Sequence, residues 1–76
     1  MDIASLVIRA RPADAQRVGA RLTQLPGVEI ASFAGHGVMA VTVEDRPGAS
    51  FEQTLLDIHQ VEGVISATLV YQHSEP

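Results

Sequence analysis

The stretch LTQLPGVEI, residues 22–30, combines the end of a helix, a turn and the start of a strand. An apolar stripe of helical spacing ends here, because Pro26 cannot extend a helix and Gly27 suits the left-handed turn that releases the chain. The same joint returns as IHQVEGVIS, residues 58–66, with Gly63 in the place of Gly27. The repeated joint predicts a chain made of two similar halves.

Apolar periodicity predicts the elements on either side of these joints. Runs of strand length alternate with stripes of helical spacing, and Ser50 with Gln53 forms a capping-box pattern before the second helix. We expect strands at residues 3–8, 28–33, 38–44 and 64–72, helices at 12–25 and 50–61, and a hairpin loop at 34–37.

This order places strand, helix and strand in each half of the chain. Two such βαβ units with right-handed crossovers interlock into a ferredoxin-like βαββαβ sandwich. We therefore expect an α+β fold whose four-stranded antiparallel sheet has the order 4-1-3-2, with two helices on one face. At 76 residues and 46% hydrophobic content, residues 1–76 are expected to form a single domain.

Composition argues against several classes of protein. The chain has no Cys, so packing must stabilise it, and its net charge of −4 argues against nucleic acid or anionic membranes as partners. The start MDIASLVIRARP, residues 1–12, carries an acid and only a short apolar run, unlike a secretory signal or a membrane span. We expect a soluble cytoplasmic protein without stable membrane association.

One face of such a sheet has no covering helix, and strand alternation predicts which side chains lie on it. A charged Arg9 should not be buried without a partner, which assigns the faces of the first strand. The predicted inward set is Leu6, Ile8, Ala10, Met39, Val41, Val43, Ala67, Leu69 and Tyr71. The predicted open-face set is Ser5, Val7, Arg9, Val38, Ala40, Thr42, Glu44, Ser66, Thr68, Val70 and Gln72.

Two alternatives stay open for this face. A one-residue bulge would reverse the assignment along any strand. A face of Ser, Thr and Val is also common on antiparallel sheets that are simply solvated, with no binding role.

The sequence contains no constellation typical of an enzyme. The histidines are expected in a loop, on a helix and in the tail, with no shared metal-ligand spacing: His36, His59 and His73. The glycine-rich 34–37 segment precedes a strand, whereas a phosphate-binding loop precedes a helix. RNA-binding sheets of this fold stack bases on aromatic residues. The aromatic residues here are Phe33, Phe51 and Tyr71, two of them expected in the core.

Three segments together resemble the NapD family: ASLVIRARP (4–12), LTQLPGVEI (22–30) and VEGVISATLVYQH (61–73). Members of this family are small cytoplasmic chaperones for NapA, the catalytic subunit of bacterial periplasmic nitrate reductase. The resemblance covers nearly the whole chain, in order and with matching spacing.

The resemblance implies a binding protein, not an enzyme, which holds the twin-arginine signal peptide of the NapA precursor until its cofactors are inserted. It implies no cofactor in the chaperone itself, and we expect a monomer. With strand alternation, it makes Glu44 the candidate partner for the basic residues of the peptide. The candidate peptide-binding residues are Ser5, Val7, Arg9, Ala40, Thr42, Glu44, Ser66, Thr68 and Val70.

Other functions are compatible with this fold. An ACT-like domain would sense a small molecule at an interface between two sheets. A structural module would pair with another subunit through an edge strand, and an acylphosphatase-like enzyme would hydrolyse an acyl phosphate.

Overall fold

The computed structural model describes residues 2–74 and contains the predicted repeat of strand, helix and strand. In the first half, β1 (Asp2–Ala10) is followed by a 3₁₀ turn η1 (Pro12–Asp14), α1 (Ala15–Leu22) and β2 (Val28–Gly35). The second half consists of β3 (Val38–Glu44), α2 (Phe51–Gln60) and β4 (Val64–Ser74).

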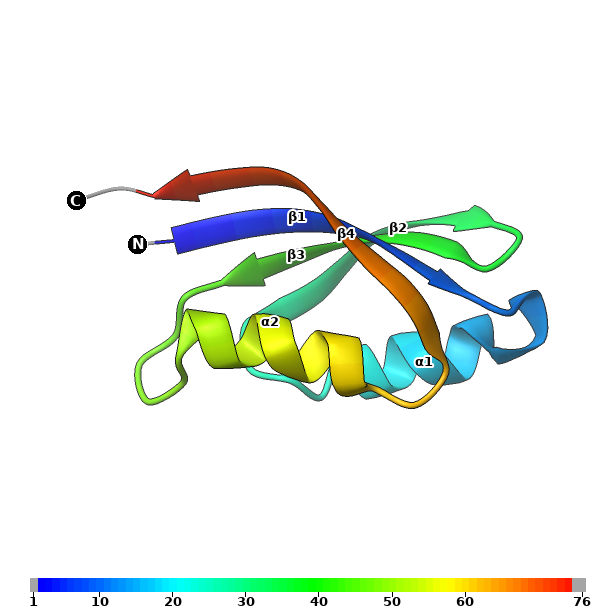
Figure 1. Cartoon of the computed structure of the whole chain (residues 1–76), viewed down its shortest axis with the longest axis horizontal. Helices are drawn as coiled ribbons and strands as arrows, with labels where there is room; N and C mark the ends of the chain where they lie inside the picture. Colours follow the sequence, from blue (N-terminus) through cyan, green and yellow to red (C-terminus); the bar gives the residue numbers. More distant parts are fainter. Residues whose placement is uncertain (1, 75–76) are drawn as a thin grey trace.

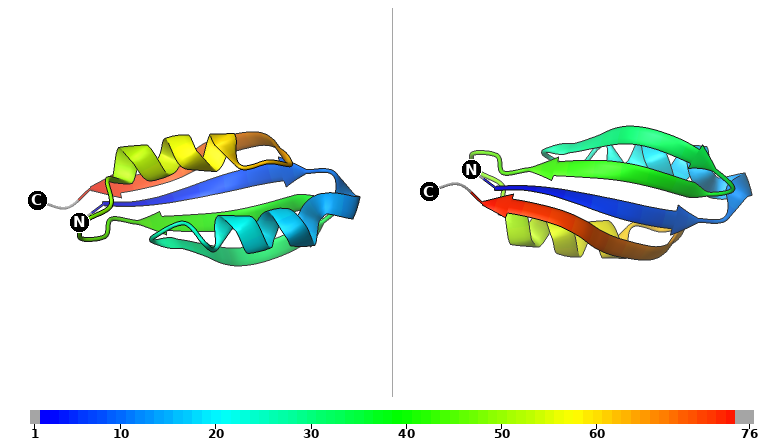
Figure 2. Two further views of the ribbon diagram at one scale, coloured as in Figure 1. Left: turned by 90° about the horizontal axis from the view of Figure 1, so that it is seen from below. Right: turned by 90° about the horizontal axis from the view of Figure 1, so that it is seen from above.

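The strands form one antiparallel four-stranded sheet of order β2-β3-β1-β4, which is the predicted order read from the other edge. Both helices lie on one side of the sheet (Figure 1). Figure 2 shows α2 beside β4 and α1 beside β2, and its right view shows the other face with no element over it. The ferredoxin-like fold predicted from the sequence is confirmed.

The core lies between the sheet and the helices. The predicted inward residues of β1 and β3 are all buried, with relative exposures of 0–5%. The buried hydrophobic residues are Ala4, Leu6, Ile8, Ala10, Val18, Leu22, Val28, Met39, Val41, Val43, Phe51 and Ile58. Strict alternation along the two central strands thus separates the covered face from the uncovered one.

The two joints have the same backbone structure. In the first, the backbone N–H of Leu25 donates to the carbonyl oxygen of Leu22, and the N–H of Val28 donates to the carbonyl oxygen of Leu25. In the second, the backbone N–H of Val61 donates to the carbonyl oxygen of Ile58, and the N–H of Val64 donates to the carbonyl oxygen of Val61. Gly27 and Gly63 have φ values of 78° and 98°, in the left-handed region that favours glycine.

Ser50 caps α2 as predicted, whereas the Gln53 side chain, which would complete the capping box, donates to Asp57 at 2.9 Å. The Ser50 side chain accepts a hydrogen bond from the backbone N–H of Gln53 at 3.3 Å. Ser50→Ala is expected to lower the free energy of unfolding by about 1 kcal/mol, because one N–H of the first turn loses its partner. For a domain of this size, the melting temperature should fall by roughly 4–8 °C in a thermal melt followed by circular dichroism.

The control is Ser32→Ala, at an exposed serine of β2 that forms no side-chain hydrogen bond within residues 2–74. An unchanged melting temperature for Ser50→Ala, or an equal fall for both variants, would contradict a stabilising cap.

The predicted assignment of faces on β4 is wrong beyond Leu69. Leu69 pairs with Leu6, but Tyr71 pairs with Ser5, so Val70 is an extra residue in the strand. This bulge moves Tyr71 to the open face and Gln72 to the helix side, the reverse of the prediction. Leu69 faces the helix side as predicted but remains 48% exposed at the sheet edge.

Two further expectations are corrected. Only Phe51 is a core aromatic residue, since Phe33 is 56% exposed and Tyr71 is 55% exposed. The Phe33 ring lies against Gly19 of α1 at the edge of the helix layer. His73 lies within β4 and not in a tail.

Candidate functional site

The uncovered face of the sheet is the candidate site, and the strand register gives its composition. Residues directly opposite each other in neighbouring antiparallel strands project from the same face. The pairs of β1 with β3 are Ile3–Glu44, Ser5–Thr42, Val7–Ala40 and Arg9–Val38. The pairs of β1 with β4 are Ile3–His73, Ser5–Tyr71, Val7–Thr68 and Arg9–Ser66.

The register therefore brings almost all of the predicted site residues onto one face. Those on β1 and β3 share it with Ser66 and Thr68, while Val70 lies in the bulge and is 60% exposed. We name this set, together with Ile3, Glu29, Ser32, Val38, Tyr71 and His73, the open face. Binding by any of these side chains stays a prediction.

The middle of the open face is floored by small and β-branched side chains. Ser5, Val7, Ala40 and Thr42 occupy the two central strands and are half-buried by their neighbours. On either side lie Thr68 of β4 and Ser32 of β2, which pairs with Ala40. A partner can approach the backbone closely here, because no long side chain projects from the centre.

Several open-face residues were missed in the sequence. Glu29 and Ser32 of β2 share the face, because they pair with Thr42 and Ala40 of β3. Alternation from the buried Val28 predicts Glu29 outward, so this signal was available. Tyr71 had no such signal, because the bulge that turns it outward leaves no mark in the residue pattern.

The two ends of the face differ in charge and chemistry. At one end Glu29 and Glu44 lie on neighbouring strands, diagonal to each other across the Thr42 position. Neither forms a salt bridge to another residue within the described range 2–74. Tyr71 and His73 border the same end, with their rings stacked at a centroid distance of 6.5 Å and an interplanar angle of 11°. Arg9 is the charged residue at the other end.

The open face presents hydrogen-bonding, apolar and charged side chains. Across residues 2–74, no group of three or more His, Asp or Glu side chains is arranged to hold a metal ion. Neither described helix is long and apolar enough to cross a membrane. What the open face can do chemically is accept a partner with a basic end and an apolar middle.

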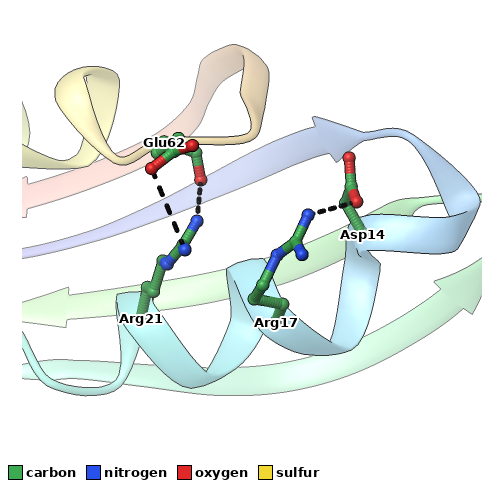
Figure 3. Close-up of polar contacts among 4 residues, drawn as sticks. All are labelled: Asp14, Arg17, Arg21 and Glu62. Atoms are coloured by element: carbon green, nitrogen blue, oxygen red, sulfur yellow. Dashed lines mark hydrogen bonds and ion pairs between the residues drawn. The ribbon is translucent and has the colours of Figure 1, made fainter.

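A second surface feature is a hollow of about 290 Å³ beside α1 and the α2–β4 turn. Figure 3 shows the polar contacts of two of its three arginines. Arg17 pairs with Asp14, and Arg21 donates to the carbonyl oxygen of Glu62 at 2.9 Å. These contacts fasten α1 to its neighbours, so they account for Arg17 and Arg21 without a ligand.

Comparison with known proteins gives a consistent result. The family model described as "NapD protein" matches residues 1–76. The proteins named "Chaperone NapD" from Escherichia coli K12 and Shigella flexneri are each 34% identical over 74 residues, which is 96% of this chain and 85% of the relative. The solution structure of the E. coli Tat proofreading chaperone protein NapD matches with a TM-score of 0.80 and 34% identity, over 96% of this chain and 78% of that chain.

Proposed function

This chain belongs to the NapD family, and we propose that it is a cytoplasmic chaperone for the twin-arginine signal peptide of the NapA precursor. By covering the peptide it delays export until the cofactors of the precursor are inserted. It acts by binding alone, as a monomer without a cofactor of its own. The observation that carries this proposal is the uncovered sheet face, with its small-residue floor and its carboxylates at one end.

The proposed binding residues form three groups on the open face. The floor contributes Ser5, Val7, Ala40, Thr42, Ser66 and Thr68. Val70 adds apolar surface at the β4 edge, and Glu44 and Arg9 supply opposite charges at the two ends.

The free energy needed for binding is within reach of such a surface. A flexible peptide that orders on binding loses on the order of 2–5 kcal/mol. With strands about 4.8 Å apart and about 3.4 Å between residues along a strand, the face measures roughly 14 by 20 Å, or about 300 Å². If half of that area is apolar, its burial contributes about 4 kcal/mol, and the matching peptide surface contributes a similar amount.

Charge complementarity favours the same partner. The chain carries a net charge of −4, and a signal peptide begins with a basic segment that precedes its apolar segment. Opposite charges speed encounter and disfavour wrong partners more than they add affinity. The charge therefore supports selection of a basic peptide, while the apolar floor supplies most of the free energy.

Calorimetric titration with the twin-arginine signal peptide of the NapA precursor from the same organism tests the proposal. We expect saturable one-to-one binding that weakens at least about tenfold when both arginines are changed to Gln, since each charge-assisted hydrogen bond contributes about 1.5–3 kcal/mol. An unrelated twin-arginine peptide is the second control and should bind more weakly. Absence of heat and of competition at high concentration would refute the proposal. A dimer that changes on adding an amino acid would support the ACT-like alternative.

A further inference from the structure

We infer that the signal peptide lies on the open face in one direction, with its arginine pair at the Glu29–Glu44 end and its apolar segment running towards Arg9. This inference rests on the proposed function and specifies the orientation in which the same face would bind the peptide. Three independent features of the face support it: its charge asymmetry, the position of Tyr71 and its length.

The charge asymmetry comes from the strand register. Glu29 lies opposite Thr42, and Glu44 lies two residues further along β3 on the same face. Such diagonal neighbours are roughly 7–8 Å apart, close enough to meet two adjacent arginines but too far for one guanidinium to satisfy both. Arg9 lies six residues along β1 from Ile3, which is the partner of Glu44. A twin-arginine segment is thus attracted to one end and repelled from the other.

A helical peptide in this direction gains a second electrostatic contribution. The amino end of a helix carries a partial positive charge and the carboxyl end a partial negative charge. With the arginine pair at the carboxylate end, the amino end of the peptide helix lies near Glu29 and Glu44. Its carboxyl end then lies near Arg9. The reverse direction makes both end contacts unfavourable.

Tyr71 gives the carboxylate end a second kind of contact. The Val70 bulge turns Tyr71 onto the open face, in the same row as Ser5, Thr42 and Glu29. Adjacent residues of a helix point about 100° apart, so two arginines in sequence need separate partners. Glu29 and Glu44 can each meet one arginine, and the exposed ring on β4 adds a stacking surface beside them, because guanidinium groups stack on aromatic faces.

The length of the face matches the length of the peptide segment. From the row of Glu44 to the row of Arg9 the sheet extends roughly 20 Å, at about 3.4 Å per residue. A helix rises about 1.5 Å per residue, so about 13 residues cover this length. The apolar segment of a signal peptide contains about 7–15 residues. The segment after the arginine pair therefore fits over Val7 and Ala40 without leaving the sheet.

Paramagnetic relaxation measurements on the complex test the direction. The wild-type protein is labelled with ¹⁵N, and a nitroxide is attached to the signal peptide either before the arginine pair or after the apolar segment. We expect the first label to broaden the backbone amide signals of Ile3 and Glu44 and to spare those of Arg9 and Ser66. The second label should do the reverse.

Charge-removing variants provide an independent measurement. Glu29→Gln and Glu44→Gln should each weaken binding about threefold to tenfold, and the loss should disappear when the peptide carries Gln in place of both arginines. Glu62→Gln is the matched control, because Glu62 has an 88% exposed side chain and lies in the α2–β4 turn away from the open face. Its affinity should stay within twofold of the wild type.

The outcomes separate this inference from the proposed function. Saturable binding with reversed broadening, or with equal broadening from both labels, would overturn the direction and leave the chaperone proposal standing. No binding of either labelled peptide, together with no binding of the unlabelled peptide, would overturn both.

Discussion

Thr42→Arg is expected to weaken binding of the signal peptide about 100-fold or more, while the melting temperature changes by less than about 2 °C. A 100-fold change corresponds to about 2.7 kcal/mol. Thr42 lies on the central strand β3, half-buried on the open face between Ser5 and Glu29. An arginine there projects into the space of the peptide backbone, and its guanidinium also neutralises Glu29 and Glu44. The core is untouched, because its residues point to the other face.

The measurement is calorimetric titration of the variant, paired with a thermal melt. Gln16→Arg is the matched control: it makes the same change in net charge at an exposed position of α1 on the covered side. Its affinity should equal that of the wild type. If Thr42→Arg binds within threefold of the wild type, the open face is not the binding surface. If the variant unfolds, the outward orientation of Thr42 is wrong.

The sequence predicts the fold and the covered face well where each strand has two neighbours. On β1 and β3, pairing on both sides holds the backbone in regular alternation, so one charged residue, Arg9, was enough to assign the two faces of β1. Met39 and Val41 are fully buried as a consequence of the same alternation. The helix-to-strand joints could also be predicted from the sequence, because Gly27 and Gly63 mark a left-handed backbone conformation that few other residues adopt.

The edge strand β4 was harder to predict, because its register is less constrained. It pairs with β1 alone, and the sheet tolerates extra residues at Ile65 and Val70. Both are apolar residues of high strand propensity, so the pattern around them shows no irregularity. Hydrogen-bonding geometry decides their position, and it is not encoded in the alternation of residue types.

The predicted site was correspondingly incomplete. Its floor on β1 and β3 followed from alternation, whereas the character of the carboxylate end depends on which residues of four strands lie in one row. Glu29 and Tyr71 are separated by more than half of the chain and are placed in the same row only by three strand pairings. A single-strand pattern carries no information about such rows.

Gly27→Ala is expected to lower the free energy of unfolding by more than about 3 kcal/mol. Any L-residue at the φ of 78° carries strain of about 1–2 kcal/mol. The larger part comes from contact with β3, since a Cβ atom on Gly27 would lie 2.2 Å from the carbonyl oxygen of Glu44. The same backbone region is fixed by a 2.9 Å hydrogen bond from the N–H of Glu44 to the oxygen of Gly27. A backbone oxygen cannot rotate away, so the strand end itself must move.

Gly48→Ala and Gly63→Ala make this prediction quantitative, because they separate strain from contact. Gly48 has a φ of 81° but open space at the Cβ position, so its variant should lose only the strain of about 1–2 kcal/mol. A Cβ atom on Gly63 would meet Cγ2 of Val18 at 2.6 Å, a side-chain atom that can shift, so its loss should be intermediate. Chemical denaturation of the three variants should therefore rank them Gly48, Gly63 and Gly27 in order of increasing loss. An equal loss in all three would mean that φ strain alone acts at these joints and that the Gly27–Glu44 contact relaxes freely. The predicted order would instead show that the first joint is held tightly against β3, the strand that carries Thr42 and Glu44. The joint between α1 and β2 would then help to position the open face.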